Sequence, residues 1–289
     1  MHYVTAKGIL SARGGMNIYR GCTHGCIYCD SRSLCYGFTH RFEDIEVKQN
    51  AIELLENALR RKRKKCMIGT GAMSDPYMPL EAELGYTRRA EELALKYGFG
   101  MTVQTKSADI MRDAELIAEI NKKTKFVVQT TLTTADDALC RILEPNVSPT
   151  SERVKMLAFM RERGIPTVVW LCPILPFIND SEDNINGIID RCVAAGVYGI
   201  INFGMGLTLR DGNREYFYAM LDRHFPSLKD RYIKTYGNSY ECASPNNDRL
   251  MRLLYERCEK SGIVCDNAAI FAYLHELPER GGYEQPRLF

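Results

Sequence analysis

Short β-like runs alternate with helix-like runs along the 289-residue chain up to about residue 203. Six runs have the apolar, β-branched and aromatic content of buried strands. They are Met16–Tyr19, Cys66–Gly69, Met101–Gln104, Phe126–Gln129, Thr167–Leu171 and Gly199–Phe203. Repeated β/α units build parallel sheets, because each crossover helix returns the chain to the same edge. The alternation therefore limits the fold to the α/β class with a mainly parallel sheet.

The segments between these runs carry apolar residues at three- and four-residue steps, which predicts amphipathic helices. They are Asp44–Arg61, Thr87–Tyr97, Ala108–Asn121, Ser151–Arg163 and Glu182–Ala195. Gly98, Gly164 and Gly196 follow three of them, where a glycine that ends a helix is expected. Six units are fewer than the eight of a closed barrel, so we predict a partial (β/α)6 barrel of the TIM type.

The last third of the chain has a different character. It contains predicted helices at Tyr216–His224 and Asp248–Ser261, followed by a polar tail. We assign residues 1–205 to the barrel core and residues 206–289 to a C-terminal helical extension. We expect this extension to close the open barrel or its substrate side.

Composition narrows the class of protein. Hydrophobic residues make up 45% and charged residues 26% of the chain, the mix of a globular protein with a large core. The net charge of +2 gives no general attraction to polyanions, so a nucleic-acid surface would have to be a local patch.

No apolar stretch approaches the roughly 20 residues of a membrane span, and the first residues lack the apolar core of a signal peptide. Eleven cysteines, an odd number, suit a reducing compartment better than a disulfide framework. We therefore expect a cytoplasmic protein with no membrane association.

Three of the cysteines follow the first predicted strand at the spacing C-x3-C-x2-C. They are Cys22, Cys26 and Cys29. Thiolates are the usual protein ligands of iron–sulfur clusters, and three of them can hold three irons of a [4Fe–4S] cubane. The fourth iron then keeps an open coordination site for a bound molecule. The alternative is a zinc site completed by His24 or His40, although zinc ligands usually come in two short pairs and the sequence has no second C-x2-C.

The motif C-x3-C-x-Tyr-C after the first strand resembles the radical S-adenosylmethionine (SAM) superfamily. Those enzymes bind SAM at the open iron, and one electron cleaves it to methionine and a 5′-deoxyadenosyl radical that abstracts a hydrogen atom. The resemblance implies a [4Fe–4S] cluster and SAM as cofactors, with an external one-electron reductant of the flavodoxin or ferredoxin type.

Further short motifs are similar, in order and spacing, to the spore photoproduct lyase-like group. They are Ser74–Pro79 with Glu81, Tyr86–Arg88, Thr105–Ser107, Leu143–Pro145, Arg153 and Pro173–Pro176 with Asn179 and Asp180. The resemblance implies that Ser74 and Lys106 bind SAM, with Lys106 as the partner of its carboxylate, and that Tyr28 lies near the adenine. Three further residues are candidates for binding SAM: Asp75, Thr131 and Arg153.

In parallel β/α barrels, functional residues gather at the carboxyl ends of the strands. The cysteine loop and five other segments follow the predicted strands directly, so we expect them to converge on one mouth. The five are Gly69–Tyr77, Thr105–Ser107, Thr130–Thr131, Cys172–Pro173 and Asn202–Gly204.

Two positions depart from the lyase pattern. Ala72 stands where those lyases carry a hydrogen-donor cysteine, and Asp30 replaces a tyrosine beside the third cluster cysteine. Thymine-dimer repair that ends with hydrogen donation from that cysteine is therefore not expected. Cys35 and Cys172 are close enough to the predicted mouth to act as substitute donors.

Two features would suit a protein that works on DNA. Arg60–Lys65 is a run of six cations, but it ends a helix and precedes the second strand, which places it at the opposite end of the barrel from the mouth. The segment Gln285–Phe289 resembles the sliding-clamp-binding peptide of bacterial DNA-repair and replication proteins, and it matches at Gln285, Leu288 and Phe289.

These observations predict a radical SAM enzyme of the lyase or oxidoreductase type. A lesion or modified nucleotide in DNA is the first hypothesis for its substrate, and a peptide or small metabolite is the second. A non-catalytic binding module that contains zinc or a cluster is the alternative from a different class of protein.

Overall fold

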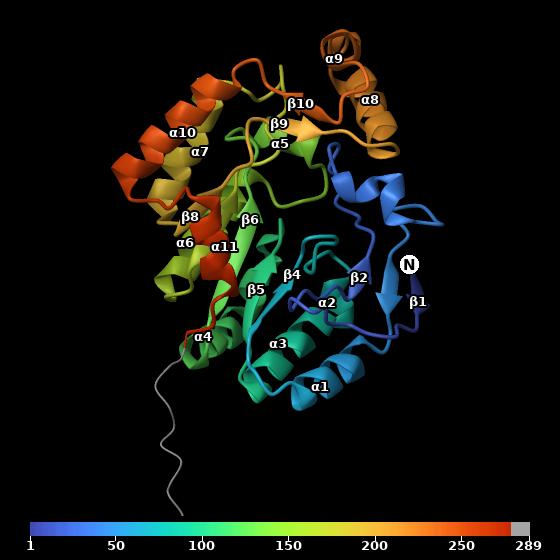
Figure 1. Ribbon diagram of the computed structural model, residues 1–289, viewed down its shortest axis with the longest axis vertical. Helices are drawn as coiled ribbons and strands as arrows, with labels where there is room; N and C mark the ends of the chain where they lie inside the picture. The colour runs from blue at the N-terminus through green and yellow to red at the C-terminus, as the bar shows by residue number, and fades with distance from the viewer. Residues whose placement is uncertain (279–289) are drawn as a thin grey trace, which may run out of the picture.

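Five parallel strands form the central sheet of the protein (Figure 1). In spatial order they are β4 (Met67–Thr70), β5 (Gly100–Gln104), β6 (Phe126–Thr131), β7 (Thr167–Trp170) and β8 (Gly199–Ile201). The computed structural model describes residues 1–278. Every residue of β6, the central strand, is buried. Such continuous burial is usual for a parallel strand that is covered on both faces.

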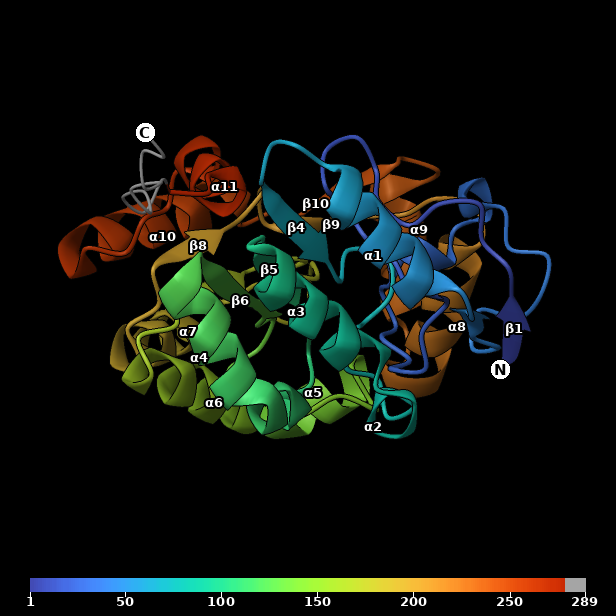
Figure 2. The same cartoon turned by 90° about the horizontal axis from the view of Figure 1, so that it is seen from below.

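Helices cover the outer face of this sheet and follow its curvature as an arc (Figure 2). They are α1 (Ala51–Arg61), α3 (Tyr86–Tyr97), α4 (Ala114–Lys123), α6 (Thr150–Glu162) and α7 (Glu182–Ala195). In α1 the buried residues are Ala51, Leu55 and Leu59, which share one face because they lie four residues apart. The partial α/β barrel expected from the sequence is therefore confirmed.

The predicted helix ends are also confirmed. Gly98, Gly164 and Gly196 have φ angles of 70°, 70° and 60°. Glycine adopts this left-handed conformation without the steric cost of a Cβ atom, which is why it ends helices so often. At the other end of α7, the Ser181 side chain accepts a hydrogen bond from the backbone N–H of Asn184.

The N-terminal part differs from the prediction in two ways. The run Met16–Tyr19 is not a full strand of the sheet, because only a single parallel bridge joins Gly15 to Gly69. The chain then forms β2 (Tyr19–Arg20), which pairs antiparallel with β3 (Glu46–Lys48). The helix predicted for Asp44–Arg61 is wrong in its first part, since residues 46–48 are β3.

Tertiary pairing explains both differences. Besides β2, the strand β3 pairs in parallel with β1 (His2–Val4), and Val47 at its centre is fully buried. Helical periodicity continues through this segment of the sequence, but the two neighbouring strands take up its backbone hydrogen bonds instead.

The C-terminal region covers one edge and the top of the barrel. Strands β9 (Gly206–Thr208) and β10 (Glu241–Ala243) pair antiparallel, with α8 (Asn213–His224) and α9 (Leu228–Tyr236) between them in sequence. Helix α10 (Asn247–Ser261) packs on α7, and α11 (Asn267–His275) packs against β8. The helices predicted at Tyr216–His224 and Asp248–Ser261 lie within α8 and α10.

The remaining short elements are helices and 3₁₀ turns in the connections. They are α2 (Glu81–Leu84), α5 (Asp137–Leu143), and 3₁₀ turns at Asp30–Arg32, Leu34–Tyr36 and Ala108–Asp113. Within residues 1–278, no helix combines the length and the hydropathy that crossing a membrane requires. The predicted clamp-binding segment Gln285–Phe289 lies outside the described residues.

Candidate active site at the carboxyl ends of the strands

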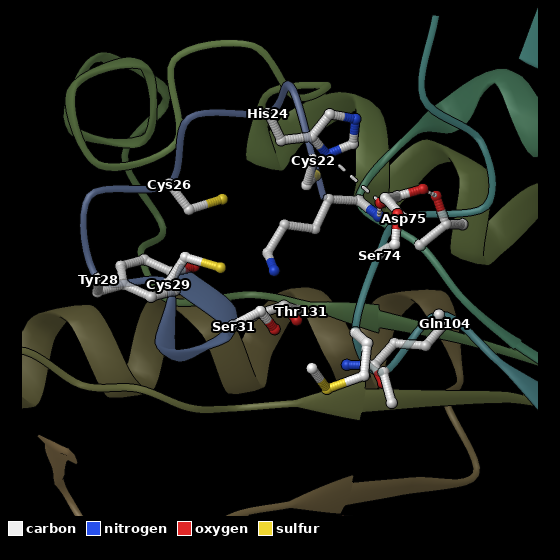
Figure 3. Close-up of a pocket in the computed structure, with 15 residues that line it drawn as sticks. Cys22, His24, Cys26, Tyr28, Cys29, Ser31, Ser74, Asp75, Gln104 and Thr131 are labelled. Carbon is white, nitrogen blue, oxygen red and sulfur yellow. Dashed lines mark hydrogen bonds and ion pairs between the residues drawn. The ribbon is translucent and has the colours of Figure 1, made fainter. Parts of the chain in front are cut away.

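The cysteine loop meets the ends of β4, β5 and β6 around a cavity of about 80 Å³ (Figure 3). Cys22, Cys26 and Cys29 line this cavity together with Tyr28. The other lining residues come from the carboxyl ends of the three strands or from the cysteine loop: His24, Ser31, Gly71, Ala72, Met73, Ser74, Asp75, Gln104, Thr105, Lys106 and Thr131. The convergence expected from the β/α alternation is therefore present.

Backbone contacts fix the cysteine loop in place. The N–H of Cys22 donates to Phe42 O at 3.1 Å, and the N–H of Ile27 donates to Leu143 O at 2.9 Å. Gly21 has a φ angle of 91°, and a Cβ atom there would lie 2.4 Å from the oxygen of Phe42. The position requires glycine, because a side chain would force this close backbone contact apart.

The positions of the three sulfur atoms test which metal group fits. A tetrahedral zinc ion with Zn–S bonds of about 2.3 Å holds its sulfur ligands roughly 3.8 Å apart. Within residues 1–278, Cys22, Cys26 and Cys29 belong to no set of three potential ligands whose atoms all lie within 4.8 Å of one another. They nevertheless line one cavity. This arrangement does not match a zinc site and suits a polynuclear group that keeps its ligands further apart.

The protonation of the cysteines follows from their burial. Burial, reinforced by Asp75, raises the pKa of Cys22 to about 12, and burial raises the pKa of Cys26 well above the ordinary thiol value. The free thiols of Cys22 and Cys26 are therefore protonated at neutral pH. Binding of iron has to displace these protons, as it does wherever thiolates become metal ligands.

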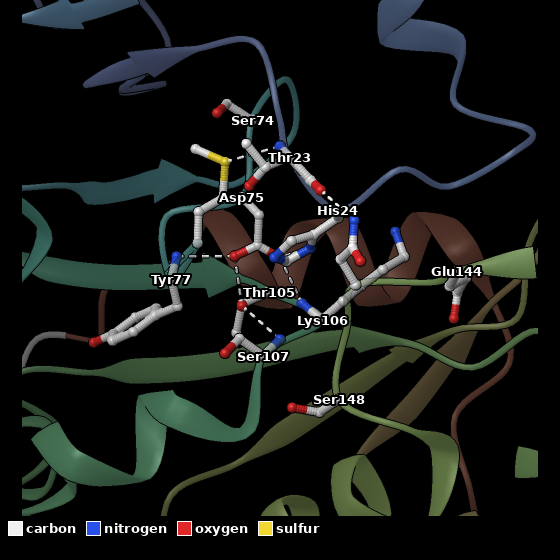
Figure 4. Close-up of polar contacts among 12 residues, drawn as sticks. Thr23, His24, Ser74, Asp75, Tyr77, Thr105, Lys106, Ser107, Glu144 and Ser148 are labelled. Atoms are coloured by element: carbon white, nitrogen blue, oxygen red, sulfur yellow. Dashed lines mark hydrogen bonds and ion pairs between the residues drawn. The ribbon is translucent and has the colours of Figure 1, made fainter. Parts of the chain in front are cut away.

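Asp75 is the centre of a hydrogen-bond network beside the cluster loop (Figure 4). Its carboxylate accepts from the Thr105 hydroxyl at 2.7 Å, from Lys106 N–H at 2.7 Å and from Tyr77 N–H at 2.8 Å. It also faces Nδ1 of the buried His24 at 3.4 Å. Asp75 thus joins the cysteine loop to the loop that follows β5.

Ser74 secures the beginning of the same loop, because its hydroxyl donates to Gly21 O at 2.5 Å. Burial lowers the pKa of His24 and outweighs the opposing effect of Asp75, so the imidazole is neutral at neutral pH. Ser74 and Asp75 both line the cavity, yet their polar atoms already bind protein groups.

Lys106 lines the cavity as a cation without a counterion. Its Nζ atom lies 5.9 Å from the centre of the Tyr28 ring, and no carboxylate of residues 1–278 forms an ion pair with it. Burial alone would lower the pKa of this amine, but the negative charges of Glu144 and of Cys26 in its thiolate form outweigh burial and raise the pKa of Lys106. A charged amine in such a place is suited to bind the carboxylate of a small molecule.

Behind Tyr28 lies a fully buried ion pair between Glu144 and Arg153. The Tyr28 hydroxyl donates to Glu144, and Arg153 Nη1 donates to the backbone oxygen of Thr131 at 2.5 Å. The structure therefore places Arg153 behind the wall of the cavity and not in it. The sequence grouped Arg153 with the SAM-binding candidates, but its nitrogens are used to hold Glu144 and the end of β6.

A second cavity of about 670 Å³ adjoins the first. The two cavities share several wall residues, among them Cys29, Lys106 and Thr131. The larger cavity is also lined by Trp170 and Phe203, whose ring centres are 6.0 Å apart. Phe203 is 64% exposed, which is unusual for so large an apolar side chain.

The candidate hydrogen donors differ in position. Cys172 lines the larger cavity, and burial raises the pKa of its thiol to about 12. Cys35 lines neither cavity and lies near Arg210, whose Nη1 is 3.5 Å from its sulfur. Ala72 lies in the shared wall, so no thiol is present at that point.

Several lining residues were not singled out from the sequence. Gln104 is the last residue of β5, and Trp170 is the last residue of β7 and the only tryptophan of the chain. The rule that selects strand-end residues would have found both. Pairing between β6 and β7 places Thr131 directly beside Trp170. The run Arg60–Lys65 includes the last two residues of α1 and part of the connection to β4, away from both cavities, as expected.

A parallel β/α barrel with a three-cysteine loop at its mouth defines a class of iron–sulfur enzyme. Residues 16–189 match the model of the radical SAM superfamily, and the chain belongs to this superfamily. Its cofactors are therefore a [4Fe–4S] cluster and SAM. Cys22, Cys26 and Cys29 are the candidate ligands of the cluster.

The chain is also similar to a curated protein and to solved structures. A protein of Mycobacterium bovis is 30% identical over 249 residues, which cover 82% of this chain and 71% of the relative. A spore photoproduct lyase structure superposes with a TM-score of 0.65 at 13% identity, covering 91% of this chain and 80% of the lyase. Another lyase structure, with bound AdoMet and dinucleoside spore photoproduct, gives a TM-score of 0.62 at 12% identity and covers 84% and 72% of the two chains.

Proposed function

We propose that the protein cleaves SAM reductively to a 5′-deoxyadenosyl radical, which abstracts hydrogen from a lesion or modified nucleotide in DNA. This would be a reaction of the lyase or oxidoreductase type. The observation that carries the proposal is the shared wall of the two cavities. Cys29 and Lys106 border both spaces, so a nucleoside bound near the cysteine loop would lie next to a substrate in the larger cavity.

Residues of the smaller cavity have distinct parts in SAM binding under this proposal. Lys106 pairs with the carboxylate of SAM, because it is a cation that lines the cavity and has no ion-pair partner among residues 1–278. Tyr28 lies near the adenine, and Thr131 contacts SAM from the end of β6. Three residues act by positioning these groups: Ser74, Asp75 and Arg153.

The size and lining of the larger cavity favour a nucleotide. About 670 Å³ lies within the range of roughly 300–1,000 Å³ that small-molecule sites occupy. The exposed ring of Phe203 beside Trp170 offers a surface on which a base can stack. The bound dinucleoside spore photoproduct of a lyase with the same fold supports a substrate of this class.

The C-terminal region contributes to the same cavity. Residues of β9 and β10, together with Tyr240, form part of its lining. This supports the proposal that residues 206–289 are an extension of the 1–205 core and close the substrate side.

Cys172 is the hydrogen donor in our proposal, because it lines the larger cavity and Cys35 does not. Its S–H bond would break as a C–H bond forms on the product radical. One electron from the external reductant, of flavodoxin or ferredoxin type, and one proton would then restore the thiol. The raised pKa of Cys172 keeps the thiol protonated, as hydrogen donation requires.

The test of catalysis is the formation of 5′-deoxyadenosine. Anaerobically reconstituted protein should produce it from SAM and dithionite, and a variant with Cys22, Cys26 and Cys29 all changed to alanine should not. A Cys192→Ala variant, which alters a buried cysteine of α7, is the matched control. A wild-type protein with an intact cluster that yields no 5′-deoxyadenosine would identify a binding module instead.

The test of the substrate is stimulation of that reaction. Ultraviolet-irradiated oligonucleotides should increase the 5′-deoxyadenosine yield over undamaged ones, and Phe203→Ala should weaken the effect, since one stacked base contributes about 1–3 kcal/mol. Stimulation by peptides or small metabolites alone would contradict a DNA substrate. With Cys172→Ala, the product radical formed from irradiated DNA should not receive its hydrogen atom, so the normal product should not form. Cys35→Ala should keep wild-type turnover.

The C-terminal segment Gln285–Phe289 remains our proposed contact for a bacterial sliding clamp. Clamp protein immobilised on a resin should retain the full chain and should not retain a Leu288→Ala, Phe289→Ala variant. Equal recovery of the two proteins would end this idea.

A further inference from the structure

Three potential metal ligands meet outside both cavities. His2, His40 and Glu46 each offer one ligand atom within 4.8 Å of the other two. In residues 1–278 no other set of at least three histidine, cysteine or acidic side chains meets this criterion. The site lies in the N-terminal β1–β3 region, and none of its residues lines a cavity described above.

Strand pairing brings two of the ligands together. In the parallel register of β1 and β3, His2 lies directly opposite Glu46. Paired residues of neighbouring strands project on the same side of a sheet. The next residue of β3, Val47, points to the other side and is fully buried. The backbone therefore sets His2 and Glu46 side by side on the face away from the core.

His40 reaches this face from the loop between β2 and β3. Its Nε2 atom is 2.8 Å from Glu46 Oε1, and its ring centre is 4.8 Å from that of His2. The Phe38 ring packs edge-on against His40 at 5.5 Å. With the side chain of His40 only 18% exposed, the ring is held in one place.

In both histidines the same nitrogen, Nδ1, makes the outer contact. Nδ1 of His2 is bound to Asp44 Oδ2 at 3.0 Å, and Nδ1 of His40 is bound to Arg41 O at 2.9 Å. Histidines that bind metals through Nε2 usually donate Nδ1–H to a carboxylate or a backbone carbonyl in this way. Both imidazoles thus have an outer contact of the kind that orients a metal-binding histidine.

Glu46 is the shared acceptor at this point. Both ring nitrogens of His40 face oxygen acceptors, Arg41 O and Glu46 Oε1, so Nε2 must carry a proton or bind a metal ion. Arg20 lies 3.1 Å from the same Glu46 oxygen. Arg20 is held by its own partners, the carbonyl oxygens of Tyr36 at 2.5 Å and Gly37 at 3.0 Å. A metal ion would therefore replace the His40 proton while Arg20 stays in place.

We propose that His2, His40 and Glu46 bind a divalent transition-metal ion, with zinc as its closest chemical match. Two imidazoles and one carboxylate are a ligand set that zinc accepts, and a water molecule would complete its tetrahedral coordination. The ion would join β1, β3 and the loop between β2 and β3. This site is independent of the iron–sulfur cluster and of the proposed reaction.

Zinc binding to cluster-loaded protein tests this site, since iron then occupies the three cluster cysteines. Calorimetric titration with Zn²⁺ alone should show one zinc per chain, with the iron content unchanged. His40→Ala and Glu46→Gln should each weaken zinc binding more than about tenfold, because even the loss of an outer contact costs a metal site that much. His275→Ala, which alters a histidine at the end of α11, should bind zinc as the wild type does.

His2→Gln guards against a variant that fails to fold, because the side chain of His2 is 40% exposed and its loss should not unfold β1. Zinc should slow hydrogen exchange of the amides of residues 37–48 in the wild type and leave exchange unchanged in His2→Gln. Equal zinc affinity in the wild type and in the His2 and His40 variants would overturn the proposal, as would a wild-type protein that binds no zinc.

Discussion

Arg153 and Glu144 form an ion pair in which neither side chain has any exposure to solvent. Glu144 accepts a hydrogen bond from Tyr28 in the cysteine loop, and Arg153 donates one to Thr131 O at the end of β6. The pair therefore joins two sides of the smaller cavity from behind. Its members do not line the cavity, and they act on the site by holding Tyr28 and Thr131.

Breaking this pair should be costly. Arg153→Met leaves the Glu144 carboxylate buried without its counterion, which should lower the free energy of unfolding by about 3–5 kcal/mol. Urea denaturation followed by circular dichroism measures the loss. Arg163→Met is the matched control, because Arg163 pairs with a mostly exposed Glu115 and its loss should cost at most about 1 kcal/mol.

The double variant Arg153→Met, Glu144→Gln separates the buried charge from other effects. It should recover much of the lost stability, since the remaining amide is neutral and can still accept a hydrogen bond from Tyr28. A double variant that is less stable than Arg153→Met alone would contradict this account of the pair.

Lys106→Met should weaken SAM binding with little effect on the cluster. The substitution removes the cation that faces the cavity, and a hydrogen bond to a charged group contributes about 1.5–3 kcal/mol, so the Kd for SAM should rise about 10- to 100-fold. Equilibrium dialysis with reconstituted protein measures this Kd. Lys123→Met, which changes a lysine whose Nζ binds Leu95 O on the outer surface, should leave the Kd unchanged. An unchanged Kd for Lys106→Met would show that another group binds the carboxylate.

The sequence predicts helix α7 to the residue, because Ser181 and Gly196 mark its two ends with side-chain and backbone chemistry that needs no tertiary partner. It does not predict β3, because three residues form a strand there only through pairing with β1 and β2. Local periodicity located the long helices whose apolar faces pack on the sheet. In the predicted helix Ala108–Asn121, however, residues 108–113 form a 3₁₀ turn before α4 begins.

The same division applies to the site. Strand-end position correctly brought Ser74, Lys106 and Thr131 to one cavity, since a parallel barrel fixes that geometry. The position of a residue in the sequence does not show that Arg153 lies behind the wall of the cavity. That position depends on its buried ion pair with Glu144, which forms only in the folded chain. The meeting of His2 with Glu46 likewise depends on strand register, which a single sequence does not specify.

Glu91 should make stability depend on pH in an unusual direction. Burial, with a further contribution from Asp113, raises its pKa well above the ordinary value of 4.5. Among residues 1–278, its Oε2 atom has no hydrogen-bond partner, while Oε1 accepts from Tyr77 at 2.9 Å. A carboxyl group whose pKa is raised on folding binds more protons in the folded state. Its contribution is therefore full below pH 4.5 and is lost as the pH rises toward the folded pKa.

Glu91→Gln should remove this dependence, because an amide does not ionise. The free energy of unfolding of Glu91→Gln relative to the wild type should increase with pH between about pH 5 and 8, by up to about 1.4 kcal/mol per pH unit. Urea denaturation at several pH values gives the difference. Glu92→Gln, on the same helix but half-exposed, should show a difference that is flat with pH. A flat difference for Glu91→Gln would mean that this carboxyl group titrates normally.

Asp75→Asn should affect the cluster and SAM together, in contrast to Lys106→Met. Asp75 accepts three hydrogen bonds and faces His24, which lies between two cluster cysteines. An asparagine would point an NH2 group at one of these donors, so the free energy of unfolding should fall by about 1.5–3 kcal/mol. Because the loops that carry Lys106 and His24 lose their common partner, iron retained after gel filtration and SAM affinity should both decrease. Asp109→Asn, at an exposed position of the next turn, should change neither quantity. If Asp75→Asn lowered SAM affinity and kept all of its iron, Asp75 would bind SAM directly and would not position the cysteine loop.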